Sequence, residues 1–174
     1  MKFELVGTFN PEPILQELIV TNFWDWMSLR KIHGLNHGSV QDIVLRFQPV
    51  QGMHPMLKYF DGIECVDYFP QVYLPYTMKA IKDFAGDRTI GKALVAKLKP
   101  QGEIVKHIDE GLYCRVHDRF HMVVKTNPSV CFECDGTYQH MKEGEIWQFD
   151  NKSTHSVVNA GDESRIHLIV DIRK

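Results

Sequence analysis

The sequence lacks the features that mark membrane, secreted and nucleic-acid-binding proteins. Its 174 residues contain no apolar run of membrane-spanning length, and the opening M-K-F-E-L-V-G-T-F-N-P has no apolar signal core. The formal net charge is only −2, so no basic surface is available for nucleic acid or anionic lipid. We therefore expect a cytoplasmic monomer or homodimer with neither nucleic-acid nor membrane partners.

Cysteine is also scarce, and its pattern does not predict a zinc site. The chain has four cysteines, and the pair Cys131 and Cys134 has no second C-x-x-C motif to complete four zinc ligands. The surrounding S-V-C-F-E-C-D-G-T-Y is typical of a strand that enters a turn. Residues three apart on a strand point to opposite faces, so these sulfurs should diverge. We interpret these two and Cys65 and Cys114 as buried or half-buried free thiols.

The chain has no internal repeat or long linker, which predicts a single domain over residues 1–174. In the first half, about 1–90, Pro11 and Pro13 open a helical stretch with apolar residues at helical spacing as far as Met27. The segment 39–47 is the first plausible strand, and 49–75 looks irregular. The segment 75–86 predicts a short helix that ends at glycine.

From about residue 92 the apolar pattern changes to a period of two. Seven or eight short alternating segments follow one another, separated by P-Q-G, T-N-P, C-D-G and N-A-G-D-E-S, which are typical turn sequences. This pattern predicts a mainly β fold: a double-stranded β-helix (jelly-roll or cupin-like) core over about 91–174, preceded by N-terminal helices.

One constellation in this half points to a metal. His107 and Asp109 are two apart in the strand-like I-V-K-H-I-D-E-G, so their side chains should share a face. His155, in F-D-N-K-S-T-H-S-V-V-N, is a third candidate ligand. Two histidines and one carboxylate that leave open positions suit non-haem Fe(II).

Arg165 stands ten residues beyond His155, at the start of R-I-H-L-I-V-D-I. Alternation puts Arg165, His167, Ile169 and Asp171 on one face and a purely apolar set on the other. A buried arginine needs an anionic partner, and its guanidinium fork matches a carboxylate. A dicarboxylate that chelates iron at one end and contacts Arg165 at the other meets both demands. In the alternative, Arg165 lies at a sheet edge and pairs with an acidic residue of the preceding turn, Asp162 or Glu163.

Four blocks in order, K-L-K-P-Q-G-E-I-V-K-H-I-D, R-F-H-M-V-V-K-T-N-P, G-E-I-W-Q-F-D-N-K-S-T-H-S-V-V-N-A-G and R-I-H-L-I-V-D-I, resemble the aspartyl/asparaginyl β-hydroxylase family. This group of Fe(II)- and 2-oxoglutarate-dependent oxygenases includes proline 3-hydroxylase-like enzymes, and the resemblance covers residues 97–172. It implies that His107, Asp109 and His155 bind the iron. It also implies that Arg165 binds the distal carboxylate of 2-oxoglutarate.

The resemblance also assigns the family's R-x-H pair, which contacts the carboxylate end nearer the metal, to Arg119 and His121. Arg115 and His117 have the same spacing and compete for this role. We prefer Arg119 and His121 because they begin an apolar strand. Some family members that act on protein domains lack the carboxylate ligand; the presence of Asp109 is more similar to the proline hydroxylase-like branch.

The resemblance implies an Fe(II)/2-oxoglutarate-dependent dioxygenase that uses O2 to hydroxylate an amino acid, free or within a peptide or protein, and releases succinate and CO2. The first half of the chain would then shape the substrate pocket. Two alternatives are a cupin-like metal- or ligand-binding module without 2-oxoglutarate turnover and a cupin isomerase or dioxygenase that does not use 2-oxoglutarate. A buried Arg165 argues against both, because neither needs it.

The remaining histidines and aromatic residues give weaker signals. His33 and His37 have helical metal-ligand spacing, but the glycines around them disfavour a helix. With Arg46, they are candidates to line the substrate entrance. The other notable residues are interpreted as structural: Trp24 and Trp26 as core, and Asp150 and Asn159 at turns and strand ends.

Overall fold

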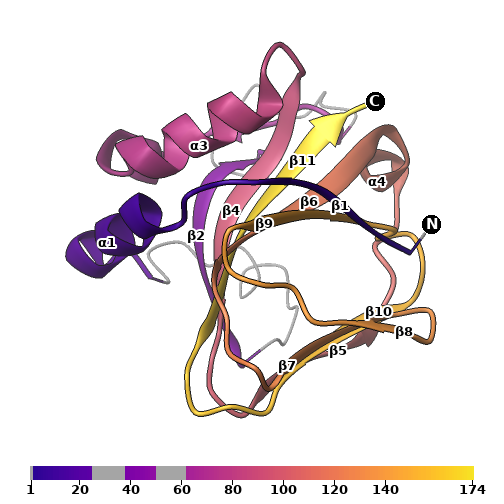
Figure 1. Cartoon of the computed structure of the whole chain (residues 1–174). Coiled ribbons are helices and arrows are strands. Elements are labelled where there is room, and N and C mark those ends of the chain that lie inside the picture. The colour runs from indigo at the N-terminus through magenta and orange to yellow at the C-terminus, as the bar shows by residue number, and fades with distance from the viewer. Residues whose placement is uncertain (1, 25–37, 50–61) are drawn as a thin grey trace.

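In the computed structural model, which describes residues 2–24, 38–49 and 62–174, the strands form two facing sheets (Figure 1). In these residues the larger sheet has the order β1-β9-β6-β11-β4-β2-β3 and the smaller one β5-β10-β7-β8. The strands are β1 (Phe3–Thr8), β2 (Val40–Phe47), β3 (Val66–Asp67), β4 (Ile90–Leu98), β5 (Gly102–His107), β6 (His117–Lys125), β7 (Val130–Cys134), β8 (Thr137–Gln139), β9 (Glu145–Phe149), β10 (His155–Asn159) and β11 (Arg165–Arg173). The predicted mainly β, jelly-roll core is confirmed.

Helices cover one side of the larger sheet. The helical elements are α1 (Glu12–Thr21), the 3-10 helix η2 (Phe69–Tyr73), α3 (Pro75–Ala85) and α4 (Leu112–Val116). Figure 1 shows α1 and α3 outside the larger sheet, on the side away from the smaller one. The sheet therefore carries two packed faces, one against helices and one against the second sheet.

The alternation along β11 separates these two cores. Its even-numbered residues, Ile166 to Ile172, pack with Ile14, Leu18 and Ile81 of the helices. Ile169, on the other face, packs with Phe132 and Val157 of the smaller sheet. Arg165, His167 and Asp171 share the inner face with Ile169 and are each 1% exposed. Polar residues therefore lie inside the barrel.

The structure corrects one boundary at the start of the chain. The expectation that 39–47 is the first strand is wrong, because β1 precedes it and pairs antiparallel with β9 from Phe3 opposite Phe149 to Thr8 opposite Glu145. The helix opened by Pro11 and Pro13 ends at Thr21, with Asn22 in the left-handed region at φ 46°. Met27, at the end of the expected helical pattern, lies outside the described residues. The expected strand 39–47 and helix 75–86 are confirmed as β2 and α3.

All four cysteines are free thiols, as the sequence predicts, but the expectation that they are buried or half-buried is wrong for Cys131, which lies on an exposed face of β7. Cys131 is exposed and Cys134 is fully buried, so the two sulfurs of the C-F-E-C motif diverge. In the described part of the chain, no helix has both the length and the apolar character needed to cross a membrane.

Glu17 of α1 links the two covering helices. This buried carboxylate accepts hydrogen bonds from the backbone N–H of Tyr76 (2.8 Å) and Thr77 (2.9 Å), and from Thr77 Oγ1 (2.6 Å). The first N–H groups of a helix have no partner within the helix, so Glu17 satisfies donors that α3 leaves unpaired. It also fixes α3 against α1.

We expect Glu17→Ala to lower the free energy of unfolding by about 1–3 kcal/mol, because it leaves buried donors without an acceptor. Urea denaturation measures this change. The matched control is Glu12→Ala on the same helix, where the carboxylate is exposed and binds only Gln16 (2.8 Å). Equal stability of the two variants would contradict the linking role of Glu17.

Candidate metal centre

Strand pairing brings two histidines together. His107 is the last residue of β5, His155 is the first of β10, and the two stand directly opposite each other in the antiparallel ladder. Their ring centroids are 4.2 Å apart. These two histidines are far apart in the sequence, and the register between β5 and β10 brings their imidazoles side by side.

Asp109 completes the cluster from beyond the strand end. Because β5 ends at His107, the carboxylate is placed by the following loop, where the Asp109 N–H bonds the Asn151 carbonyl at 3.1 Å. Asp109 Oδ1 lies 3.7 Å from His107 Nε2. One ligand atom each from His107, Asp109 and His155 lies within 4.8 Å of the others. The three residues singled out from the sequence are thus close enough to share one ion.

The hydrogen bonds of both imidazoles favour metal binding. Nδ1 of His107 lies 2.8 Å from the Val105 carbonyl, and Nδ1 of His155 lies 2.9 Å from the Ser153 carbonyl. A carbonyl only accepts, so both Nδ1 atoms carry the proton and both Nε2 atoms have the ligating lone pair. Burial lowers the pKa of His155, although the Ser153 carbonyl opposes this, and so keeps the ring neutral.

Arg119 and Asp171 hold the third candidate ligand. Asp171 accepts two hydrogen bonds from Arg119, at Nε (2.8 Å) and at NH2 (2.9 Å), and Arg119 NH1 donates to Asp109 Oδ2. Asn151 Nδ2 also donates to Oδ2, at 3.2 Å. Burial opposes ionisation of Asp109, but the Arg119 charge and these neighbours hold its pKa below the usual value. The carboxylate is ionised, with Oδ2 engaged and Oδ1 turned toward His107.

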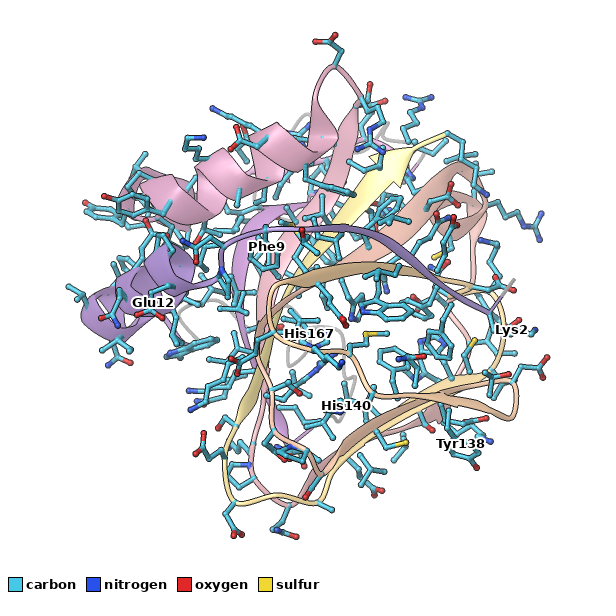
Figure 2. The ribbon with its side chains drawn as sticks, in the orientation of Figure 1. Lys2, Phe9, Glu12, Tyr138, His140 and His167 are labelled. Carbon is cyan, nitrogen blue, oxygen red and sulfur yellow. The ribbon has the colours of Figure 1, made fainter. Side chains whose placement is uncertain are left out.

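Arg165 lies deeper in the barrel among histidines. It is 1% exposed, and its NH2 is 2.6 Å from His167 Nδ1 and 3.3 Å from His121 Nδ1. Figure 2 shows His167 in the space between the two sheets. Burial, followed by the Arg165 charge, moves the pKa of His167 far below its usual value. Burial and the neighbouring guanidinium thus favour the neutral form of the His167 ring.

The structure separates the predicted R-x-H pair into two environments. Arg119 contacts the candidate metal ligand Asp109, whereas His121 lies beside Arg165 and His167, with its Nδ1 3.1 Å from that of His167. The competing pair does not share a strand, because Arg115 belongs to α4 and is exposed while His117 begins β6.

The remaining sequence candidates lie outside this cluster or outside the described residues. Glu163, offered as a partner of Arg165, instead pairs with Lys125 at 2.7 Å. Arg46, a candidate for the substrate entrance, pairs with Asp67 at 2.6 Å. His33, His37 and Trp26 are not among the described residues. Asp150 and Asn159 accept and donate turn hydrogen bonds, as expected.

Sequence reasoning missed Asp171 and Asn151 as neighbours of the site. Asp171 was placed on the inner face of the last strand, but its partner Arg119 is 52 positions away in the chain. Asn151 is 42 positions from Asp109. The available signal was that Arg119 on β6 and Asp171 on β11 each belong to a run of polar residues two positions apart. That pattern indicates the ion pair only once β6 and β11 are known to be neighbours.

Fold and cluster together define a jelly-roll protein with a two-histidine, one-carboxylate site at one end of the barrel. The family model described as Aspartyl/Asparaginyl beta-hydroxylase matches residues 69–174, well over half of the chain. The chain belongs to this family. The match includes all three candidate ligands and Arg165.

Two curated relatives and one solved structure are similar to this chain. L-proline cis-3-hydroxylase 1 from Streptomyces sp is 31% identical over 88 residues, which cover 51% of this chain and 28% of the relative. L-proline cis-3-hydroxylase 2 is 28% identical over 109 residues, which cover 63% and 36% respectively. The chain thus matches about a third of the length of these relatives.

The solved structure is an oxidoreductase of the 2OG-Fe(II) oxygenase family from Burkholderia pseudomallei. It matches with a TM-score of 0.55 at 10% identity, over 77% of this chain and 66% of that one. At this identity the likeness concerns the fold, which agrees with the jelly-roll core.

Proposed function

We propose that this chain is an Fe(II)- and 2-oxoglutarate-dependent dioxygenase that hydroxylates an amino acid, free or within a peptide or protein. The observation that carries the proposal is the cluster of His107, Asp109 and His155, whose ligand atoms lie within 4.8 Å of one another. Family membership and the hydroxylases among the relatives support the same reaction class. L-Proline, which the relatives' names contain, is the first substrate to test.

In this proposal His107, Asp109 and His155 would hold Fe(II), and this donor set would leave the metal able to accept co-substrate and O2. When bound, iron and 2-oxoglutarate supply the oxidant for an unactivated C–H bond. The protein contributes a neutral His155, an ionised Asp109 and a buried cation at Arg165. A guanidinium fits the distal carboxylate of 2-oxoglutarate with two parallel hydrogen bonds.

The fold alone also suits a cupin-like module that binds metal or ligand without turnover. Arg165 favours the oxygenase, because a barrel that binds only a metal does not need a guanidinium that is 1% exposed in its interior. The two functions differ in one measurable property, the metal-dependent binding and consumption of 2-oxoglutarate.

The experiment is succinate release from 2-oxoglutarate by the wild-type chain with Fe(II) and ascorbate, with and without L-proline. We expect slow uncoupled turnover alone and faster turnover with a true substrate. A parallel titration of 2-oxoglutarate into protein loaded with Co(II), an air-stable stand-in for Fe(II), should show metal-dependent binding. Absence of both succinate and metal-dependent binding would leave the cupin-like module as the function.

Asp171 should matter to the metal although it does not contact it. Asp171→Asn weakens the hold on Arg119 and hence on Asp109 Oδ2, so we expect Co(II) affinity to fall about 10- to 100-fold, as for other groups that orient a ligand. Calorimetric titration of the metal measures this. The matched control is Asp118→Asn on β6, whose carboxylate faces Lys174 at 3.3 Å. Unchanged Co(II) affinity in Asp171→Asn would contradict the orienting role.

A further inference from the structure

Lys92 is a cation on the inner face of the barrel that the metal site does not use. It stands two residues before Leu94 on β4, and Leu94, Ala96 and Leu98 all pack into the core between the sheets. Ala93 packs on the opposite face, against the helices. The pairing of β4 with β11 shifts register between Ile90 and Ala93, so the direction of the Lys92 side chain follows from its contact with the Phe47 ring, which packs against the core between the sheets.

The ammonium of Lys92 has aromatic neighbours in place of an acidic partner. Nζ lies 4.1 Å from the ring centroid of Tyr113 and 4.5 Å from that of Phe47. Within residues 2–24, 38–49 and 62–174, no carboxylate forms an ion pair with it; nearby Asp171 is held by Arg119. The aromatic rings attract a cation but leave its charge unbalanced. Burial, with the Arg119 charge next, lowers the pKa of Lys92.

Close packing fixes this arrangement. The Tyr113 hydroxyl accepts a hydrogen bond from the Lys92 backbone N–H at 2.6 Å, and the Tyr113 ring stacks on His117 at 4.0 Å. Gly91 leaves the necessary room, because a Cβ there would lie 2.3 Å from the Tyr113 hydroxyl oxygen. Lys92 therefore sits in a rigid setting built from three elements, β2, β4 and the α4–β6 region.

The register of the larger sheet places Lys92 at the metal end of the barrel. Arg165 stands opposite Leu98, six residues along β4, which corresponds to about 20 Å at ~3.3 Å per residue. Arg119 stands opposite Asp171, at the other end of β11, and contacts Asp109. A co-substrate bound at Arg165 would therefore extend toward the metal from the end of β4 opposite to Lys92.

We propose that Lys92 binds the carboxylate of a free amino acid substrate and so turns its carbon skeleton toward the metal ligands. The proposal rests on the proposed function and narrows its substrate class from amino acids that are free or within a polypeptide to free amino acids. A half-buried ammonium between two rings admits a compact anion and gives it a partner with little remaining hydration. Within a polypeptide, the α-carboxyl group of every residue but the last is part of a peptide bond, so these residues offer no α-carboxylate.

The test uses protein loaded with Co(II) and 2-oxoglutarate, titrated by calorimetry with each proteinogenic free L-amino acid and with its primary amide. We expect at least one amino acid to bind and its amide to bind about 10- to 100-fold more weakly, the loss expected for a hydrogen bond to a charged group. Lys92→Met should lower the affinity for the same amino acid by a similar factor, and Lys92→Arg should retain part of the wild-type affinity.

The matched control is Lys97→Met on the same strand, whose ammonium lies 4.1 Å from the Trp24 ring centroid. It should bind the amino acid as the wild type does. Co(II) binding by Lys92→Met confirms that this variant is folded.

Equal binding of acid and amide, full affinity in Lys92→Met, or no bound amino acid would overturn the proposal. So would a loss of 2-oxoglutarate binding in Lys92→Met, since the carboxylate would then be the co-substrate's. Failure of the wild type to bind Co(II) and 2-oxoglutarate would instead refute the proposed function.

Discussion

Replacing His155 by alanine should lower Co(II) affinity by more than about a hundredfold and abolish succinate release. Loss of a group that only orients a metal ligand costs 10- to 100-fold in affinity, so loss of the ligand itself should exceed that range. The imidazole is buried, and the Ser153 carbonyl, 2.9 Å from its Nδ1, fixes the orientation of the ring. Calorimetry and a succinate assay measure the two losses.

His140→Ala is the matched control for His155→Ala. His140 is half-buried and, like His155, bonds a carbonyl through Nδ1, that of Val130 at 2.9 Å, but it lies outside the candidate ligand cluster. It should retain wild-type Co(II) affinity. If His155→Ala still binds Co(II) as tightly as His140→Ala, the two-histidine, one-carboxylate site is not the metal site.

Arg165→Met should separate co-substrate binding from metal binding. Removal of one partner from a buried, hydrogen-bonded charge pair costs about 2–5 kcal/mol, so the Kd for 2-oxoglutarate should rise at least ~30-fold. Co(II) affinity should stay close to wild type, because Arg165 contacts His167 and His121 and is not among the three candidate ligands. Titration of 2-oxoglutarate into the Co(II)-loaded variant gives the answer.

Arg88→Met provides the comparison for Arg165→Met. Arg88 is exposed and its guanidinium lies 4.9 Å from the Phe84 ring centroid, on the helix side of the sheet. This variant should bind 2-oxoglutarate normally. Undiminished 2-oxoglutarate affinity in Arg165→Met would remove the main reason for preferring an oxygenase to a cupin-like module.

The sequence predicts the fold class and the candidate ligands because both depend on local patterns. Alternation over 165–172 assigns Arg165 and His167 to one face whatever the strand's neighbours are, and the structure places both inside the barrel. The H-x-D spacing likewise brings two donor groups close, even though the strand ends at His107 and a loop places Asp109. These features are recognised from residues two positions apart, whereas His155, far along the chain, joins the other ligands only through the pairing of β5 with β10.

Features that depend on which strands are neighbours could not be predicted in this way. The strand β1 contains Gly7, and its Leu5 is 49% exposed, so its sequence lacks a clear apolar alternation. It is a strand because it pairs with β9. Similarly, the ion pair of Arg119 and Asp171 follows from the β6–β11 register. Until that register is known, Arg119 can be assigned to the co-substrate as readily as to the carboxylate it contacts.

The pairing of β5 with β10 has a mechanical consequence. In the smaller sheet β5 is one of the two edge strands and is held by a single ladder, in which His107 stands opposite His155. An ion bound by both of these side chains would cross-link β5 and β10 at the last residue pair of that ladder. Loss of the metal would then loosen an outer edge of the barrel as well as its reactive centre, and slippage of β5 by one residue would be opposed most strongly when the metal is present.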